Sequence, residues 1–312
     1  MVQPGKFVLR AGVNALTAIF VVGVLAGLAL TPDGRAWLRN PTVMLGDKAS
    51  ASAPPAPAPV AAAPAHAVVP AAARVTPLNA RLAQGPLRIG VFGDSMADGL
   101  YAGLYRDLQD QPNVSVTKFS QVSTGLSRYD YVNIHAKTQA QLDEQPVDVA
   151  VMLFGTNDAQ GIDTGGTVHM FGTDGWKAAY GQRIDDLVAL LRSRDVAVYW
   201  VGLPRMKRDS FDGRMMLING VVEARMRALG VPYIETVSLT SNAEGGYEAY
   251  LPAANGRRTL MRAGDGIHMS MAGYLRMSGP VAARLKRDAG LDRPRPTPGL
   301  VSAATPPVSP AA

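Results

Sequence analysis

The chain of 312 residues has no cysteine. This absence excludes disulfide bonds, metal sites with thiolate ligands and a cysteine nucleophile. The sequence also lacks the zinc-binding pattern HExxH, the Walker phosphate loop and the glycine fingerprint of dinucleotide-binding folds. We therefore expect no metal ion and no cofactor.

A concentrated basic surface is also missing. The net charge is only +6, and the basic residues are scattered along the chain without interleaved aromatic side chains. Proteins that bind nucleic acid normally carry a basic patch or stripe, so we expect no nucleic-acid partner. An anionic polymer of the cell envelope or a membrane surface would suit this modest positive charge.

Residues 11–30 (AGVNALTAIFVVGVLAGLAL) contain no charge, and Lys6 and Arg10 precede them. A helix of this length rises about 30 Å, the thickness of the hydrocarbon core of a bilayer. A cleaved signal peptide is the alternative, but its apolar region normally spans only about 7–15 residues. We expect an uncleaved signal anchor in the bacterial inner membrane, with residues 1–10 in the cytoplasm and the remainder in the periplasm. A secreted periplasmic form is the alternative.

Composition divides the remaining chain into three parts. Residues 31–85 are rich in alanine and proline and predict a disordered linker. Residues 291–312 have a similar composition and predict a disordered tail. The segment between them, residues 86–290, has a suitable length for a single α/β domain.

Within residues 86–290, short apolar runs alternate with longer segments of helical spacing. Runs that are almost continuously apolar suit parallel strands covered on both faces. The pattern predicts a three-layer α/β/α fold with a doubly wound, flavodoxin-like sheet of five parallel strands. The strands are expected at 87–92, 114–119, 147–154, 196–203 and 231–236. The helices are expected at 97–110, 132–144, 176–194, 213–229 and 271–288.

Residues 91–100 (VFGDSMADGL) place Ser95 where the first strand turns into a helix. Ser95 and Asp98 form a Ser-x-x-Asp pattern, which is typical of a helix cap. A nucleophilic serine at the start of a helix is the alternative interpretation, and the two roles are compatible. A catalytic serine requires partners at the same edge of the sheet, because ligands of such folds bind beyond the carboxyl ends of the strands.

Suitable partners follow the other strands. Gly125 lies in a polar loop after the second strand, Asn157 lies in GTND directly after the third, and Asp265 and His268 precede the last helix. Acyl transfer through serine requires a nucleophile, a base, a group that orients the base, and donors for the oxyanion. None of the other three histidines has an aspartate three residues before it. Taken singly, Gly125 could serve a left-handed turn, and the other residues could be ordinary loop side chains.

The blocks GDS, Gly, GxND and DxxH, in this order, resemble those of the SGNH hydrolases, the superfamily of GDSL-type esterases. The resemblance covers residues 86–290, and GLSR, GTNDAQ, WVGLP and DGIHMS look most like a bacterial envelope branch known only as a domain of unknown function. The chain departs from the common pattern at Met96, where leucine often follows the serine. Another apolar residue there should not affect the chemistry.

The resemblance implies a role for each of these residues. Ser95 is the nucleophile, His268 the general base, and Asp265 the group that orients His268. The backbone N–H groups of Ser95 and Gly125 and the side-chain amide of Asn157 form the oxyanion hole. Asp94 and Asp158 are expected to support the loops by hydrogen bonding rather than to take part in the reaction.

Two long segments border the predicted site. About 17 residues separate GTND from Trp176, and residues 240–266 suggest a β-hairpin or an extended loop. Trp176 could line a substrate groove or anchor a helix to the core. Three arginines close in sequence to the site blocks are further candidates for substrate binding: Arg128, Arg205 and Arg262.

The sequence thus predicts a membrane-anchored periplasmic serine esterase. The expected substrate is an O-acyl ester, in particular an O-acetyl ester, of an envelope polysaccharide or peptidoglycan. This choice of substrate depends on the anchor, the spacer and analogy at the level of the fold. An O-acyltransferase, a lipid or thioester hydrolase and a glycan-binding domain without turnover remain alternatives.

Overall fold

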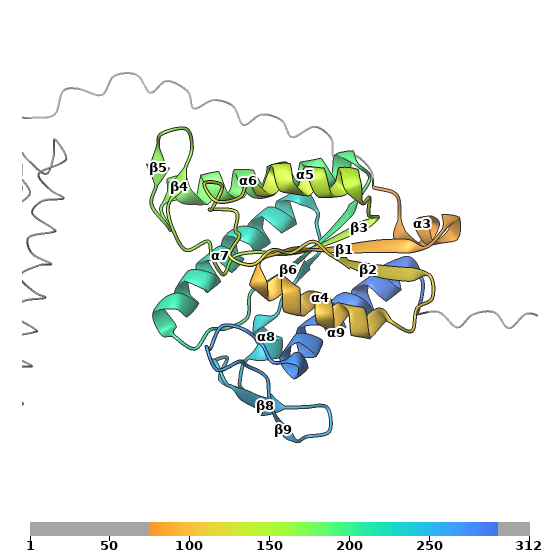
Figure 1. The fold of residues 1–312 in the computed structure, drawn as a ribbon. Coiled ribbons are helices and arrows are strands. Elements are labelled where there is room, and N and C mark those ends of the chain that lie inside the picture. The colour runs from red at the N-terminus through yellow and green to blue at the C-terminus, as the bar shows by residue number, and fades with distance from the viewer. Residues whose placement is uncertain (1–74, 293–312) are drawn as a thin grey trace, which may run out of the picture. The chain divides into compact units, whose positions relative to one another are not determined.

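The computed structural model of the protein describes residues 75–292. Its centre is a sheet of five parallel strands in the order β2-β1-β3-β6-β7 (Figure 1). The strands are β1 (Leu87–Gly93), β2 (Val114–Lys118), β3 (Val149–Leu153), β6 (Ala197–Val201) and β7 (Tyr233–Ile234). The strand order confirms the predicted doubly wound α/β sheet.

The proposed anchor at residues 11–30 and most of the predicted tail lie outside the described residues. Between residues 75 and 292, none of the helices combines the length and the apolar character that a membrane crossing requires.

Helices cover both faces of the sheet (Figure 1). The helices α4 (Ser95–Leu108) and α9 (Met271–Ala289) pack against each other below the sheet in this view. On the other side, α6 (Asp174–Ser193) packs against α5 (Ile134–Glu144) and α7 (Asp209–Leu229). This double cover explains the sequence pattern, because all five residues of β3 are buried and therefore apolar.

The winding of the chain changes direction between β1 and β3. From β1 the chain crosses to β2 on one side, whereas from β3 it crosses to β6 on the other side. The two loops that follow these neighbouring strands therefore lead in opposite directions. Ligands of doubly wound folds bind at such a point, and Ser95 lies directly beyond the end of β1.

Two small hairpins extend the loops, one at the upper left and one at the bottom of Figure 1. The first, which the sequence pattern did not predict, pairs β4 (Ile162–Asp163) with β5 (Val168–His169). The second follows α8 (Val237–Thr240) and pairs β8 (Tyr250–Pro252) with β9 (Arg258–Leu260). The second hairpin confirms the expectation for residues 240–266.

The compact part of the chain begins earlier than the expected boundary at residue 86. Helix α3 (Leu78–Gln84) occupies the end of the predicted linker. Leu78 is buried in the core, and Arg81 forms an ion pair with Asp195, with 2.8 Å between Nη2 and Oδ1. The segment LNARLAQ thus contributes an apolar anchor, Leu78, and a charge partner, Arg81, to the domain.

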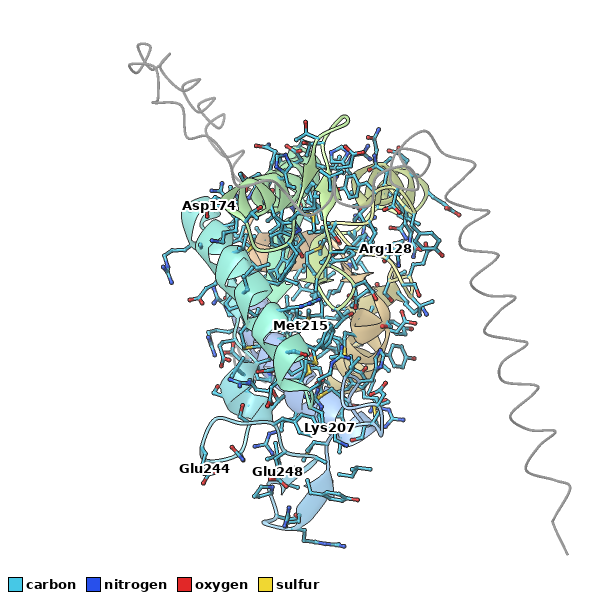
Figure 2. All side chains as sticks on the ribbon, turned by 90° about the vertical axis from the view of Figure 1, so that its left-hand side faces the viewer. Arg128, Asp174, Lys207, Met215, Glu244 and Glu248 are labelled. Carbon is cyan, nitrogen blue, oxygen red and sulfur yellow. The ribbon has the colours of Figure 1, made fainter. Side chains whose placement is uncertain are left out.

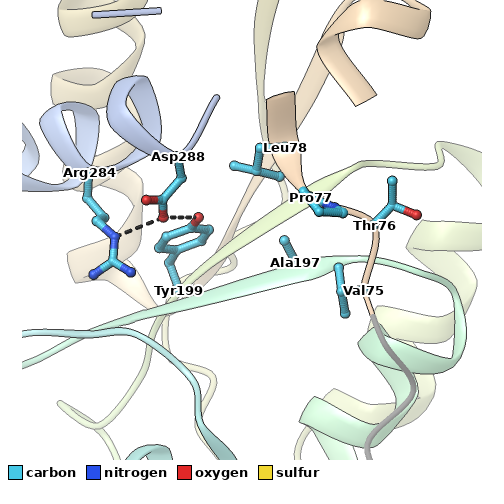
Figure 3. A pocket seen from close by; sticks show the side chains of 8 residues that line it. All are labelled: Val75, Thr76, Pro77, Leu78, Ala197, Tyr199, Arg284 and Asp288. Atoms are coloured by element: carbon cyan, nitrogen blue, oxygen red, sulfur yellow. Dashed lines mark hydrogen bonds and ion pairs between the residues drawn. The ribbon is translucent and has the colours of Figure 1, made fainter. Parts of the chain in front are cut away.

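A shallow hollow lies beside the point where the described chain begins (Figure 3). Within it, the Tyr199 hydroxyl donates a hydrogen bond of 2.6 Å to Asp288, which also accepts one of 2.8 Å from Nε of Arg284. Ala197, the first residue of β6, lines the hollow. The hollow is therefore at the amino edge of the parallel sheet, opposite Ser95, and does not belong to the same site.

Close packing of α4 on α9 leads to a first prediction. A Cβ atom at Gly99 would lie 2.0 Å from the ring of Tyr274. We expect Gly99→Ala to lower the free energy of unfolding by about 1–3 kcal/mol, because the ring must move. The matched control is Gly220→Ala on α7, where a Cβ meets no atom within 4 Å, and there we expect a gain of up to about 1 kcal/mol. Urea unfolding of both variants measures the difference, and equal stabilities would contradict the expectation.

Candidate active site

The structure brings Ser95, His268 and Asp265 into one hydrogen-bonded chain. Nε2 of His268 lies 2.8 Å from the Ser95 hydroxyl oxygen, and Nδ1 lies 2.7 Å from Oδ2 of Asp265. Ser95 begins α4, whereas the other two residues lie in the loop before α9. The His268 side chain is 35% exposed, so a substrate can reach the group.

The protonation of this chain follows from its partners. Partial burial acts to raise the pKa of Asp265, but hydrogen bonds from the His268 ring and from the N–H groups of Ile267 and His268 lower it to about 2. Asp265 is therefore ionised at neutral pH and can only accept hydrogen bonds. Nδ1 of His268 must then carry the proton, which leaves Nε2 free to accept one from Ser95.

A buried carboxylate fixes the turn that carries Ser95. Asp94 accepts a hydrogen bond of 2.9 Å from the N–H of Met96 and thereby caps α4. Its other oxygen accepts hydrogen bonds from the hydroxyl and the N–H of Thr156 and from the N–H of Gly155, at 2.6, 3.1 and 3.3 Å. Asp94 thus joins the end of β1 to the loop after β3, in the supporting role that we expected.

Ser95 itself does not cap the helix. It is the first residue of α4, and Asp94 is the cap. Asp98, which the capping pattern paired with Ser95, instead binds Lys118 and the hydroxyl of Ser120. The interpretation of Ser-x-x-Asp as a capping box is therefore wrong, because the buried residue before the serine supplies the capping oxygen.

Hydrogen bonds place the loops of Gly125 and Asn157, two of the three predicted oxyanion residues, at the same edge of the sheet as Ser95. The N–H of Gln121 donates to the carbonyl oxygen of Gly93 at 2.9 Å, so the polar loop after β2 runs beside the end of β1. Asn157 donates from Nδ2 to the carbonyl oxygen of Thr124, also at 2.9 Å. The second N–H of this amide has no acceptor among residues 75–292.

Position 125 requires glycine because the backbone there lies close to the side chain of Asp158, not because it adopts a left-handed turn. Its backbone is not among those with positive φ, but a Cβ there would lie 2.2 Å from Oδ1 of Asp158. In the described part of the chain, no hydrogen-bond acceptor is found for the N–H of Gly125 or of Ser95. Their role as oxyanion donors stays a prediction.

A second buried carboxylate supports this loop. Oδ1 of Asp158 accepts hydrogen bonds from the N–H and the hydroxyl of Ser127, and Oδ2 accepts one from the hydroxyl of Tyr180, all at 2.8 Å. Tyr180 stacks on Trp176, with 4.6 Å between ring centres. Burial raises the pKa of Asp158. The network ties the GTND block to α6 and to the loop that contains Gly125.

Trp176 belongs to this support and does not line a substrate groove. Its side chain is fully buried, and its Nε1 donates to the carbonyl oxygen of Gln160 at 2.7 Å. The prediction that Trp176 binds substrate is therefore wrong, and its alternative role as an anchor of the helix is confirmed. Trp176 and Tyr180 are four residues apart on α6, a spacing that places both on one buried face.

Two of the three candidate arginines, Arg205 and Arg262, bind other groups of the protein. Arg205 forms an ion pair of 2.7 Å with the buried carboxylate of Asp212. Arg262 is only 1% exposed and donates from Nη2 to the carbonyl oxygen of Ile267 at 2.9 Å. Arg262 cannot reach a substrate and instead holds the loop that carries His268, a role that sequence reasoning missed.

Arg128 is half-buried at the loop after β2. Its Nη1 donates to the carbonyl oxygen of Ser123 at 3.1 Å, and its guanidinium carbon lies 5.1 Å from the centre of the Tyr131 ring. Ser123 has a φ of 63°, a strained value for a residue other than glycine. Arg128 therefore stabilises the conformation of the loop that contains Gly125, while its role toward a substrate stays a prediction.

The buried Asp94 predicts a pH dependence of stability. Burial raises its pKa to about 6, although hydrogen bonds from Thr156 and Met96 act to lower it. A carboxyl whose pKa is raised by folding contributes stability below its unfolded pKa and loses it as the pH rises through the folded value. We expect wild-type unfolding free energy to fall by up to about 3 kcal/mol between pH 4 and pH 6 on account of Asp94.

Urea unfolding at pH 4, 5, 6 and 7 tests this, with Asp94→Asn as the comparison. The variant loses part of the network and is less stable throughout, but it should lack this component of the slope. Parallel pH profiles for the two proteins would contradict the assignment.

Several solved structures are similar to this chain. TesA shares 18% sequence identity with a TM-score of 0.47, over 64% of this chain and 99% of that one. A GDSL-like lipase from Bacteroides thetaiotaomicron shares 13% with a TM-score of 0.44, over 67% and 95% of the two chains. A carbohydrate esterase of family 3 from Talaromyces cellulolyticus shares 14% with a TM-score of 0.44, over 65% and 98%. Comparison with curated proteins gives no match.

A family model provides the assignment. The model described as "Protein of unknown function (DUF459)" matches residues 88–284, which is more than half of the chain. The matched range contains the blocks GDS, GTND and DGIH with their residues Ser95, Asn157 and His268. The resemblance inferred from these blocks is confirmed: the chain belongs to the DUF459 family, within the SGNH hydrolase superfamily.

Proposed function

We propose that the protein is a serine esterase that forms an acyl-enzyme on Ser95. The observation that carries the proposal is the chain of two short hydrogen bonds from the Ser95 hydroxyl through His268 to an ionised Asp265. A serine hydroxyl is a weak nucleophile unless an adjacent base accepts its proton. This arrangement supplies that base and fixes its tautomer.

The reaction follows from the proton positions. Nε2 of His268 accepts the proton as Oγ of Ser95 attacks the ester carbonyl carbon, and Asp265 stabilises the resulting imidazolium. The imidazolium then donates this proton to the leaving alcohol as the ester bond breaks. In the second half, His268 takes a proton from water as the water oxygen attacks the acyl carbon. The bond between this carbon and Oγ of Ser95 then breaks, His268 returns the proton to Oγ, and the carboxylic acid leaves.

The negative charge of the tetrahedral intermediate requires donors on the side opposite the base. Within residues 75–292, the N–H groups of Ser95 and Gly125 and the second amide N–H of Asn157 have no acceptor, so we assign these groups to the oxyanion. The amino end of α4, with its partial positive charge, lies at the same position. Two buried carboxylates, Asp94 and Asp158, hold these donors in place before the substrate binds.

The finer parts of the proposal concern location and substrate. We infer a periplasmic enzyme held at the inner membrane by residues 11–30, whose substrate is an O-acyl ester, in particular an O-acetyl ester, of envelope carbohydrate or peptidoglycan. The uncharged run of twenty residues and the Ala/Pro-rich spacer after it support the location. A net charge of +6 is compatible with an anionic polymer as the substrate.

Labelling of the full-length chain with a fluorophosphonate tests the nucleophile without a choice of substrate. We expect the wild type to be labelled and Ser95→Ala to remain unlabelled. His268→Ala should be labelled at least about 10³-fold more slowly, because the hydroxyl loses its base. The matched control is Ser193→Ala near the end of α6, which should be labelled like the wild type.

Three results would overturn parts of the proposal. Absence of labelling in a folded wild type would favour a glycan-binding domain without turnover. Labelling that survives in Ser95→Ala would place the nucleophile elsewhere. Diversion of acyl groups from water to an added glycan would identify an O-acyltransferase.

The oxyanion assignment has its own test. Asn157→Ala should lower kcat/KM for an activated acetate ester by about 10²–10³, because a charge-stabilising donor is lost. The matched control is Asn133→Ala, which removes the amide that caps α5 and should leave the rate unchanged. A loss of less than threefold in a folded Asn157→Ala protein would exclude Asn157 as a donor.

A further inference from the structure

Lys207 differs from every other lysine in residues 75–292. The other four have a recorded hydrogen-bond or ion-pair partner for their ammonium group: Lys118, Lys137, Lys177 and Lys286. Lys207 is exposed, and no partner for its ammonium group is recorded in this part of the chain. It lies on the side of the molecule that faces the viewer in Figure 2.

The position of Lys207 is fixed relative to the triad. Its N–H donates to the carbonyl oxygen of Gly266 at 3.0 Å. Its aliphatic stem lies so close to Gly266 that a Cβ there would be 2.4 Å from the Cβ of Lys207. Gly266 follows Asp265 directly and has a φ of 71°, which favours glycine. Lys207 therefore packs on the loop that carries Asp265 and His268.

The residue before Lys207 is also immobilised. Met206 is 1% exposed, and its N–H donates to Oδ1 of Asp212 at 2.6 Å. Arg262 contacts the sulfur of Met206 and donates to Ile267 on the catalytic loop. The backbone of Lys207 is thus held from two sides, and only the charged end of its side chain is free to move.

The charged groups near Lys207 in the described chain interact with other residues and do not form an ion pair with its ammonium group. The charge of Arg205 is balanced by Asp212, and the guanidinium of Arg208 lies over the ring of Phe211 at 5.6 Å. Asp265 is engaged by His268. No carboxylate of the described chain lies within 4 Å of Lys207, since no ion pair is found for it there.

We propose that Lys207 binds an anionic group, a carboxylate or a phosphate, on the carrier of the ester that Ser95 attacks. The inference rests on the proposed esterase function and defines its substrate class: an acyl ester on an anionic alcohol rather than on a neutral one. The backbone and aliphatic stem of Lys207 are held on the loop that carries Asp265 and His268, and its ammonium group has no partner among residues 75–292. Only the end of the side chain has to be ordered when an anion binds, which limits the entropy cost of binding.

Three acetate esters test the proposal on the full chain: neutral methyl 4-acetoxybenzoate, 4-acetoxybenzoate, and 4-acetoxyphenyl phosphate. Each kcat/KM is divided by the rate of hydroxide hydrolysis of the same ester, which corrects for intrinsic reactivity. We expect the wild type to prefer an anionic ester over the neutral one by about fivefold at low salt, mainly through KM. The two anionic esters distinguish a carboxylate from a phosphate, and 0.5 M salt should reduce the preference.

For each variant, we compare the ratio of the corrected kcat/KM for an anionic ester to that for the neutral ester, which we call the preference ratio. Lys207→Gln should abolish it, and Lys207→Glu should invert it. The matched control is Lys177→Gln on α6, which removes an exposed lysine away from the loop and should retain the wild-type ratio. A wild type without preference, or a preference that survives in Lys207→Gln, would overturn the proposal for Lys207. Absence of Ser95-dependent turnover of all three esters would instead overturn the proposed function.

Discussion

The burial of Asp94 is the constraint on which the site depends. A carboxylate without an adjacent cation is costly to bury, and hydrogen bonds must replace the lost water. Asp94 obtains them from the first turn of α4 and from the loop after β3, so neither segment can move without leaving a buried charge unsatisfied. Ser95 is the next residue, and its position is therefore set by contacts of the core rather than by its own side chain.

A related arrangement holds the loops after β2 and β3. Asp158 joins the loop with Gly125 to Tyr180, and the ring of Tyr180 rests on the fully buried Trp176. Burial is the largest cause of the raised pKa of both carboxyls, and for Asp94 the charge of Asp158 comes after burial and two hydrogen bonds. Both therefore act through the hydrogen bonds that they accept, and each connects the sheet edge to a different helix.

Sequence reasoning was most successful where a local pattern reflects a local cause. Continuous apolar runs predicted β1, β3 and β6, because these strands are covered on both faces. The rule for strand ends predicted that Ser95 and His268 would meet, although they are far apart in the chain. The prediction that Trp176 and Arg262 bind substrate was wrong. Nearness in sequence to the site blocks suggested that role, but the burial of an aromatic ring or a guanidinium depends on distant segments that cover it. Helix α3 was missed for the same reason: its stability comes from Leu78 and Arg81 contacting the domain.

His268 and Ser95 belong to parts of the molecule that are supported in different ways. Ser95 follows a central strand, whereas His268 lies on a segment between the β8–β9 hairpin and α9, held by backbone hydrogen bonds from Ser270 to Met261 and from Ala263 to His268. Proteins open in cooperative units of unequal stability, and a unit outside the sheet can open separately from it. Because the segment that carries His268 is not part of the sheet, a local opening of this segment alone would separate His268 from Ser95 while the sheet stayed intact.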